Sequence, residues 1–169
     1  MIFKCSWFGL TVLVVSHVWV ACWARTFEPP AAGSRAQAYA IRLTPGQDLK
    51  KELLAFAARH QLKAPTIVTC VGSLTDVNVR LANQKGGTPR KGHFEIVSLV
   101  GLLDPPGGHV HLCVTDENGM AFGGHLLDGN IVYTTVEVIV AELSDLEFTR
   151  EIDPTFGYHE LSVKRRAHP

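Results

Sequence analysis

The segment from Gly107 to Gly129 (GGHVHLCVTDENGMAFGGHLLDG) restricts the fold of this chain more than any other stretch. Its centre, Asp116 to Gly119, has the composition of a tight turn between two strands. A three-residue loop of Glu117, Asn118 and Gly119, with Gly119 in the left-handed conformation, would pair Asp116 with Met120. The sequence therefore predicts a β-hairpin whose register is set by this pair.

Three of the eight histidines of the chain lie in this hairpin. Residues i and i+2 of a strand share a face, so His109 and His111 are expected to project together. The predicted register places His125 opposite His111 on the same face. As an alternative, the pair Gly123-Gly124 would host a β-bulge and shift the register by one residue. In the simpler register, three imidazole rings converge on one spot.

Imidazole is a common ligand of zinc and related ions. His109, His111 and His125 would fill three tetrahedral positions and leave the fourth for water or substrate, as in catalytic zinc sites. A hydrolytic or lyase-type reaction would also need a general base, and the candidates are Glu95 and Glu137, which lie in otherwise apolar segments. The alternatives are that the hairpin carries three surface histidines and that both glutamates face solvent.

The composition excludes several other classes of site. Lysine plus arginine equals aspartate plus glutamate, at 16 each, so the chain has no general attraction for nucleic acid or anionic membranes. Its four cysteines (Cys5, Cys22, Cys70 and Cys113) are scattered and form no C-x-x-C motif, which argues against a disulfide framework or a thiolate zinc site. We find neither a G-x-S-x-G motif nor a phosphate-binding loop fingerprint.

The first 24 residues have the pattern of a targeting segment. The run from Trp7 to Trp23 is almost wholly apolar, and cleavage after Ala24 fits the preference of signal peptidase for small residues. A cleaved signal peptide would direct the protein to the secretory pathway. The alternatives are an uncleaved membrane anchor and a leader without a targeting role, which would leave the protein in the cytoplasm. A linker, residues 25–36, would follow.

The remaining chain predicts one helix among many strands. Leucines at helical spacing predict a helix from Asp48 to about His60, and Asn83–Gly92 is expected to be a polar loop. Alternating or apolar runs predict strands at Gln37–Leu43, Thr66–Ser73, Asp76–Ala82, His93–Leu103 and Ile131–Leu143, with short closing strands after Ser144. The pattern favours an α+β fold with a largely antiparallel sheet of about seven strands. The domain is expected to span residues 37–163, followed by a basic tail, residues 164–169.

Several motifs of this chain resemble those of the plant-and-prokaryote-conserved (PPC) domain family. They are Gly92-His93-Phe94-Glu95-Ile96-Val97-Ser98-Leu99-Val100-Gly101, the H-x-H, the Asp116–Gly119 turn, Gly123-Gly124-His125-Leu126 and Thr135-x-Glu137-Val138. The resemblance implies an α+β fold, a trimer and, as in prokaryotic members, a metal, expected to be zinc, held by the histidines matching His109, His111 and His125. Plant members carry AT-hook segments and largely lack these histidines. This chain departs from the family at His93, where arginine is usual.

Three hypotheses for the function follow. The first is a trimeric zinc-binding protein of unsettled activity. Its more specific form is a metal-dependent enzyme that acts on a small molecule. The second is a DNA-associated regulatory protein, by analogy with the relatives; the neutral charge and the absence of an Arg-Gly-Arg-Pro hook count against it. The third is an oligomerisation module without catalysis.

Overall fold

The computed structural model describes residues 31–167. The predicted signal peptide or anchor, residues 1–24, and the first half of the predicted linker, residues 25–30, lie outside this range. Within it, no helix has the length and apolar character needed to cross a membrane.

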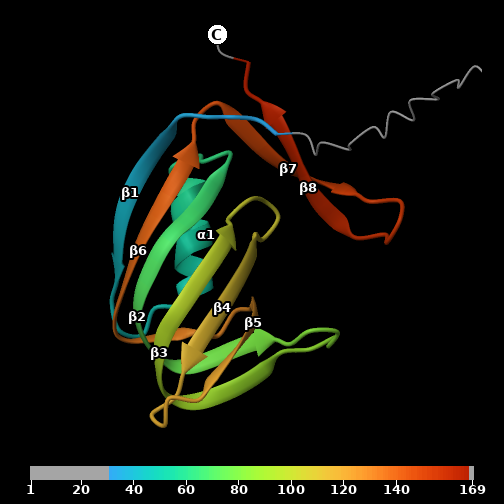
Figure 1. The fold of residues 1–169 in the computed structure, drawn as a ribbon. Helices are drawn as coiled ribbons and strands as arrows, with labels where there is room; N and C mark the ends of the chain where they lie inside the picture. Colours follow the sequence, from blue (N-terminus) through green and yellow to red (C-terminus); the bar gives the residue numbers. More distant parts are fainter. Residues whose placement is uncertain (1–30, 168–169) are drawn as a thin grey trace, which may run out of the picture. The chain divides into compact units, whose positions relative to one another are not determined.

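Six antiparallel strands form the main sheet, in the order β1-β6-β2-β3-β4-β5 (Figure 1). Their bounds are Ala36–Leu43 for β1, Pro65–Arg80 for β2, Thr88–Leu102 for β3, His109–Thr115 for β4, Ala121–Leu126 for β5 and Ile131–Leu143 for β6. The long strand β2 pairs with β6 and β3, and its last two residues also pair with β5. Strands β2, β3, β4 and β5 therefore close on one another, which brings the end of β2 beside the histidine hairpin.

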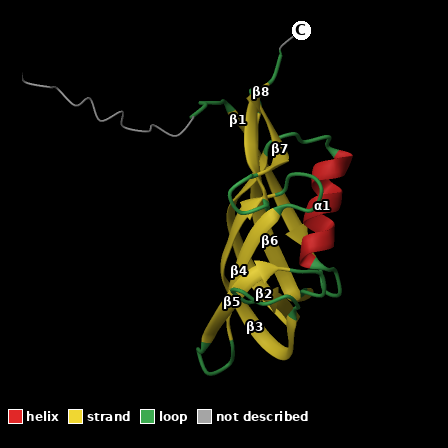
Figure 2. Ribbon diagram, turned by 90° about the vertical axis from the view of Figure 1, so that its right-hand side faces the viewer, coloured by secondary structure: helices red, strands yellow, loops and turns green. Residues whose placement is uncertain are grey.

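The helix α1, Leu49–Arg59, lies on one side of this sheet (Figure 2). It begins where Asp48 accepts hydrogen bonds from the backbone N–H groups of Lys50 and Lys51, as expected of an N-cap residue. Leu49, Leu53 and Ala57 recur at helical spacing and are all buried. The predicted helix, from Asp48 to about His60, is thus present with this apolar stripe against the core.

Alternation along β4 decides which side chains enter that core. Val110, Leu112 and Val114 are buried, whereas His109 and His111 between them are exposed. Successive side chains of a strand point to opposite faces, so the burial of the three apolar residues turns both histidines outward.

A second sheet consists of the hairpin β7–β8, with β7 at Leu146–Ile152 and β8 at His159–Arg165. Leu146 and Phe148 of β7 pack with Ala64 in a small separate apolar cluster. Lys164 and Arg165 belong to β8, and Arg166 forms an ion pair with Glu142. The segment predicted as a basic tail therefore begins inside the folded domain, because Glu142 and the partner strand β7 hold it.

The mostly antiparallel sheet with one helix agrees with the predicted fold class, but three details differ. The described residues form eight strands rather than about seven, and the two strands predicted at Thr66–Ser73 and Asp76–Ala82 are the single strand β2. An irregularity between Leu74 and Asp76 interrupts its pairing without ending it, which explains the break in the sequence pattern. Strand β3 begins at Thr88, inside the predicted loop, since Thr88 pairs with Val79.

Candidate metal centre

The hairpin β4–β5 has the register expected from its turn. The Asp116 N–H donates a hydrogen bond to the Met120 carbonyl (3.1 Å), and the Asp116 carboxylate accepts from the N–H groups of Asn118 and Met120 (2.9 Å each). Gly119 has a φ of 77°, the left-handed conformation that the three-residue loop requires. In this register His111 lies directly opposite His125.

No bulge occurs at Gly123 and Gly124, the alternative that the sequence left open. The two glycines instead permit close approach of neighbouring strands. A Cβ atom on Gly123 would overlap the Leu112 carbonyl oxygen of β4, and one on Gly124 would overlap the Arg80 carbonyl oxygen of β2. Strand β5 therefore fits between β4 and the end of β2 only because these side chains are absent.

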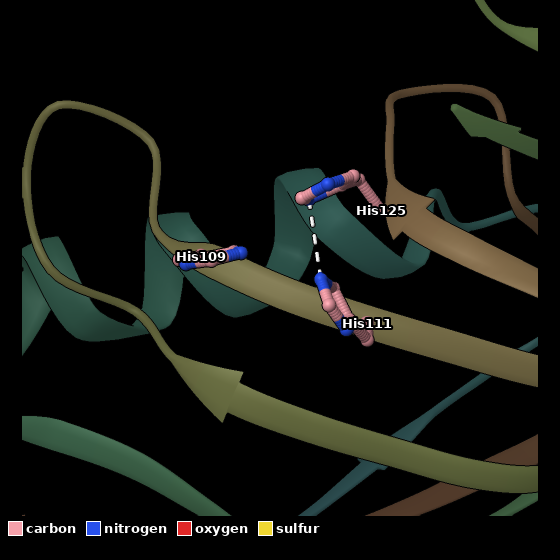
Figure 3. Close-up of side chains that lie close together, drawn as sticks. All are labelled: His109, His111 and His125. Carbon is pink, nitrogen blue, oxygen red and sulfur yellow. Dashed lines mark hydrogen bonds between the residues drawn. The ribbon is translucent and has the colours of Figure 1, made fainter. Parts of the chain in front are cut away.

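The three histidine rings meet on the outer face of this hairpin (Figure 3). The His111 Nε2 and His125 Nδ1 atoms are 3.2 Å apart, and one potential ligand nitrogen from each of the three rings lies within 4.8 Å of the others. The His109 ring stacks on that of His125, with centroids 5.2 Å apart and an interplanar angle of 16°. His125 is half-buried, and the other two are exposed.

This geometry fits a metal ion. Zinc–nitrogen bonds of 2.0–2.1 Å at tetrahedral angles place two ligand nitrogens about 3.3 Å apart. The His111–His125 pair has this spacing already, and His109 has its ring within reach of the same point. Three neutral nitrogen donors without a carboxylate are also a ligand set that zinc accepts while keeping a fourth position open.

The surroundings of two of the rings favour their neutral form, which is the form that binds metal. Partial burial is the main cause that lowers the pKa of His109, followed by the nearby charges of His111 and Arg150. Partial burial likewise lowers the pKa of His125, and the positive charge of Arg80 is the next cause. Both effects reduce the competition between protons and a metal ion near neutral pH.

A cleft of about 670 Å³ opens beside His109 and His125. Its walls come from the start of α1, the end of β2 and the turn after it, the β3–β4 loop, β5 and the β7–β8 hairpin. The residues that line it are Lys50, Arg80, Asn83, Asp104, Pro106, Gly107, Gly108, His109, His125, Arg150, Tyr158, His159 and Glu160. A ligand in this cleft would contact the histidine cluster from one side.

The two glutamates chosen from the sequence do not line this cleft. Glu95 lies on β3 opposite Thr115, about 13 Å along β4 from His111. Glu137 lies on β6, paired with Arg42 and Val71, and two strands separate β6 from β4. Both side chains are exposed.

Two carboxylates that the sequence did not single out do line it. Asp104 is fully buried and accepts two hydrogen bonds from Arg150. Glu160 of β8 is exposed, and its negative charge acts to raise the pKa of His109. Asp104 lies in the β3–β4 loop, whereas Glu160 is brought to the cleft by the tertiary fold, which places the β7–β8 hairpin beside it.

The fold and the cluster together define a class of protein: a small domain of antiparallel strands and one helix, with three histidines beside an open cleft. The family model of the Plants and Prokaryotes Conserved (PCC) domain matches residues 31–144, so the chain belongs to this family. The resemblance found in the sequence motifs is thereby confirmed.

Similar proteins are known from several organisms. A solved structure of a hypothetical protein from Salmonella cholerae-suis is 43% identical, with a TM-score of 0.79, and the match covers 80% of this chain and 99% of that one. The Bifunctional protein GlmU of Synechococcus sp. (strain JA-3-3Ab) is 41% identical over 140 residues, which are 83% of this chain. The chain spans only 22% of the length of that protein.

More distant structures share the fold. A metal-containing protein from Archaeoglobus fulgidus is 22% identical, with a TM-score of 0.63, and the match covers 78% of this chain and 98% of that one. A putative DNA-binding protein from Bacteroides thetaiotaomicron is 20% identical, with a TM-score of 0.64 and the same coverage. At these identities the likeness establishes the architecture alone.

Proposed function

We propose that the protein binds a divalent metal ion, zinc in the first place, through His109, His111 and His125. The observation that carries the proposal is the spacing of the three rings, with two nitrogens 3.2 Å apart and all three within 4.8 Å. The description of the Archaeoglobus relative as metal-containing supports it. A zinc ion would supply Lewis acidity and a water of lowered pKa at this position.

The cleft suits a metal centre that also receives a small molecule. Three protein ligands leave one tetrahedral position free, and the cleft lies beside two of them. Glu160 lines the cleft and has a carboxylate. The Asp104 carboxylate also lines it but already accepts two hydrogen bonds from Arg150. In a metal-dependent enzyme of this geometry, Glu160 is the group placed to accept a proton from a bound ligand.

Metal analysis of the purified protein tests this proposal. We expect one metal ion per chain after loading with zinc and dialysis, and loss of the metal in His111→Ala and His125→Ala. His93→Ala is the matched control, since His93 lies on β3, has its ring against that of Tyr133 and is absent from the cluster. A wild-type protein without stoichiometric metal would overturn the proposal.

We also propose that the protein is a homotrimer, as its family resemblance implies. Strands β2 and β3 carry four valines that are each more than half exposed: Val68, Val71, Val97 and Val100. Apolar surface of this kind marks protein contacts. Light scattering coupled to gel filtration should give three times the chain mass, and Val97→Asp should lower it. A wild-type monomer at micromolar concentration would refute the trimer.

A DNA-associated role is the second candidate, because one solved relative is described as a putative DNA-binding protein. The balanced charge of this chain gives it no general electrostatic attraction to DNA. Anisotropy of a labelled duplex at low salt separates the two functions: salt-sensitive binding would support the DNA role, and its absence would remove it. A stable trimer that holds neither metal nor DNA would instead indicate an oligomerisation module.

A further inference from the structure

We infer that Arg80 binds the carboxylate or phosphate group of a small-molecule ligand that occupies the cleft beside the three histidines. The inference rests on the proposed metal centre and adds the chemical class of its ligand.

Arg80 stands in one row with two of the histidines. Its Cα pairs with that of His125 across β2 and β5, and His125 pairs in turn with His111 across β5 and β4. Directly opposed residues of antiparallel strands project to the same face. Gly124 allows β5 to approach the backbone of Arg80, so the row continues without a gap from the histidines to the arginine.

The guanidinium group of Arg80 has no carboxylate partner among the residues that the structure describes. Its one polar contact is a long hydrogen bond from Nη1 to the Gln84 carbonyl, at 3.4 Å. Arg150 of β7, which also lines the cleft, differs because it donates two hydrogen bonds to Asp104. Arg80 thus retains donors for an incoming anion, and a guanidinium matches the paired oxygens of carboxylate and phosphate groups.

The cleft has a polarity that orients such a ligand. Lys50 and Asn83 line it together with Arg80. The Lys50 Nζ atom lies 3.8 Å from a carboxylate oxygen of Asp128, a residue just beyond the end of β5. Glu160 and Tyr158 line it from the β7–β8 hairpin. An anionic group is therefore attracted to the Arg80 wall and repelled by Glu160, which leaves the uncharged part of the ligand toward the hairpin.

The size of the cleft agrees with a small molecule. Its volume, about 670 Å³, falls within the range of roughly 300–1,000 Å³ typical of such sites. Because His125 adjoins Arg80, an anion held by the guanidinium would lie beside the proposed metal position, where a second polar group of the ligand would reach the open coordination site.

Anion binding to the metal-loaded protein tests this inference. Inorganic phosphate and succinate are the two probes, titrated by calorimetry and by the visible spectrum of the cobalt-substituted protein. We expect the wild type to bind at least one probe at one site per chain. Arg80→Gln should weaken that binding at least tenfold, Arg80→Lys should weaken it less, and Arg59→Gln should not change it. Arg59 is an exposed arginine at the end of α1, outside the cleft.

Metal content, measured on every variant, separates the two proposals. If Arg80→Gln keeps its metal and binds both probes as the wild type does, or if the wild type binds neither probe, the inference about Arg80 is wrong and the metal centre stands. If the wild type holds no metal, the metal centre fails and the inference fails with it. Preference for phosphate or for succinate assigns the ligand to one of the two chemical classes.

Discussion

Arg150 of β7 donates hydrogen bonds from Nε and Nη2 to the two carboxylate oxygens of Asp104, at 2.7 and 2.9 Å. The Asp104 side chain is fully buried, and that of Arg150 is 11% exposed. The backbone carbonyl of Asp104 also accepts hydrogen bonds from Gly107 and Gly108, which lead directly into His109. The Arg150–Asp104 ion pair therefore links the β7–β8 hairpin to the β3–β4 loop, which positions His109.

Asp104→Asn should destabilise the protein by about 3–5 kcal/mol, because it leaves the Arg150 charge largely buried without its counter-ion. Equilibrium unfolding in denaturant measures the change. Glu151→Gln is the control on the same hairpin. Both side chains of its ion pair with Lys164 are exposed and screened by solvent, so the loss of that pair should cost much less than the loss of the Asp104 pair. Equal losses in the two variants would mean that burial does not set the strength of the Asp104 pair.

Metal affinity should be nearly constant between pH 7 and 8 and should begin to fall only below about pH 6.5, the ordinary pKa of histidine. Burial and neighbouring positive charges lower the pKa of His109 and of His125, so both stay neutral to a lower pH than a free imidazole. Competition with a chelating dye across this range measures the affinity. A fall that begins well above neutral pH would contradict the lowered pKa values.

The lowered pKa values of His109 and His125 also predict how the stability of the metal-free protein depends on pH. Since the folded pKa values lie below the unfolded ones, the unfolded chain takes up protons first as the pH falls. Stability is therefore expected to decline below about pH 6.5 and to be insensitive to these groups above it. Denaturant unfolding of the metal-free protein at several pH values is the measurement. The dependence should weaken in His125→Ala, where one of the two groups is missing.

The histidine cluster could be predicted from the sequence because the residues that determine it lie close together in the chain. The turn from Asp116 to Gly119 sets the register, and the register sets the faces of His111 and His125. The walls of the cleft were not predictable in this way. Arg80 reaches His125 only because β2 closes on β5, and no local pattern specifies which distant strands will pair. The sequence left open whether Glu95 and Glu137 face the site or solvent, because alternation along a strand does not indicate which side chains lie beside them.

The thiol of Cys70 should be unreactive in the native protein. Burial raises its pKa to about 12, so almost none of it is thiolate at pH 8. Iodoacetamide treatment followed by peptide mapping should show little modification of Cys70 before unfolding and complete modification after it. Cys113, which is partly exposed, serves as the internal comparison. Stoichiometric labelling of Cys70 in the folded state would show that the core around β2 opens more readily than the structure implies.

Gly124→Ala should disturb the whole row from His111 to Arg80. The added Cβ would overlap the backbone carbonyl oxygen of Arg80, so β5 has to move away from β2. Overpacking of this kind costs about 1–3 kcal/mol, and the displacement of His125 should weaken metal binding together with stability. Gly107→Ala is the matched control, since a Cβ there meets no atom within 4 Å. Calorimetric titration of both variants measures the metal affinity, and denaturant unfolding measures the stability. If Gly124→Ala bound metal as tightly as Gly107→Ala, the close approach of β5 to β2 would have no part in positioning His125.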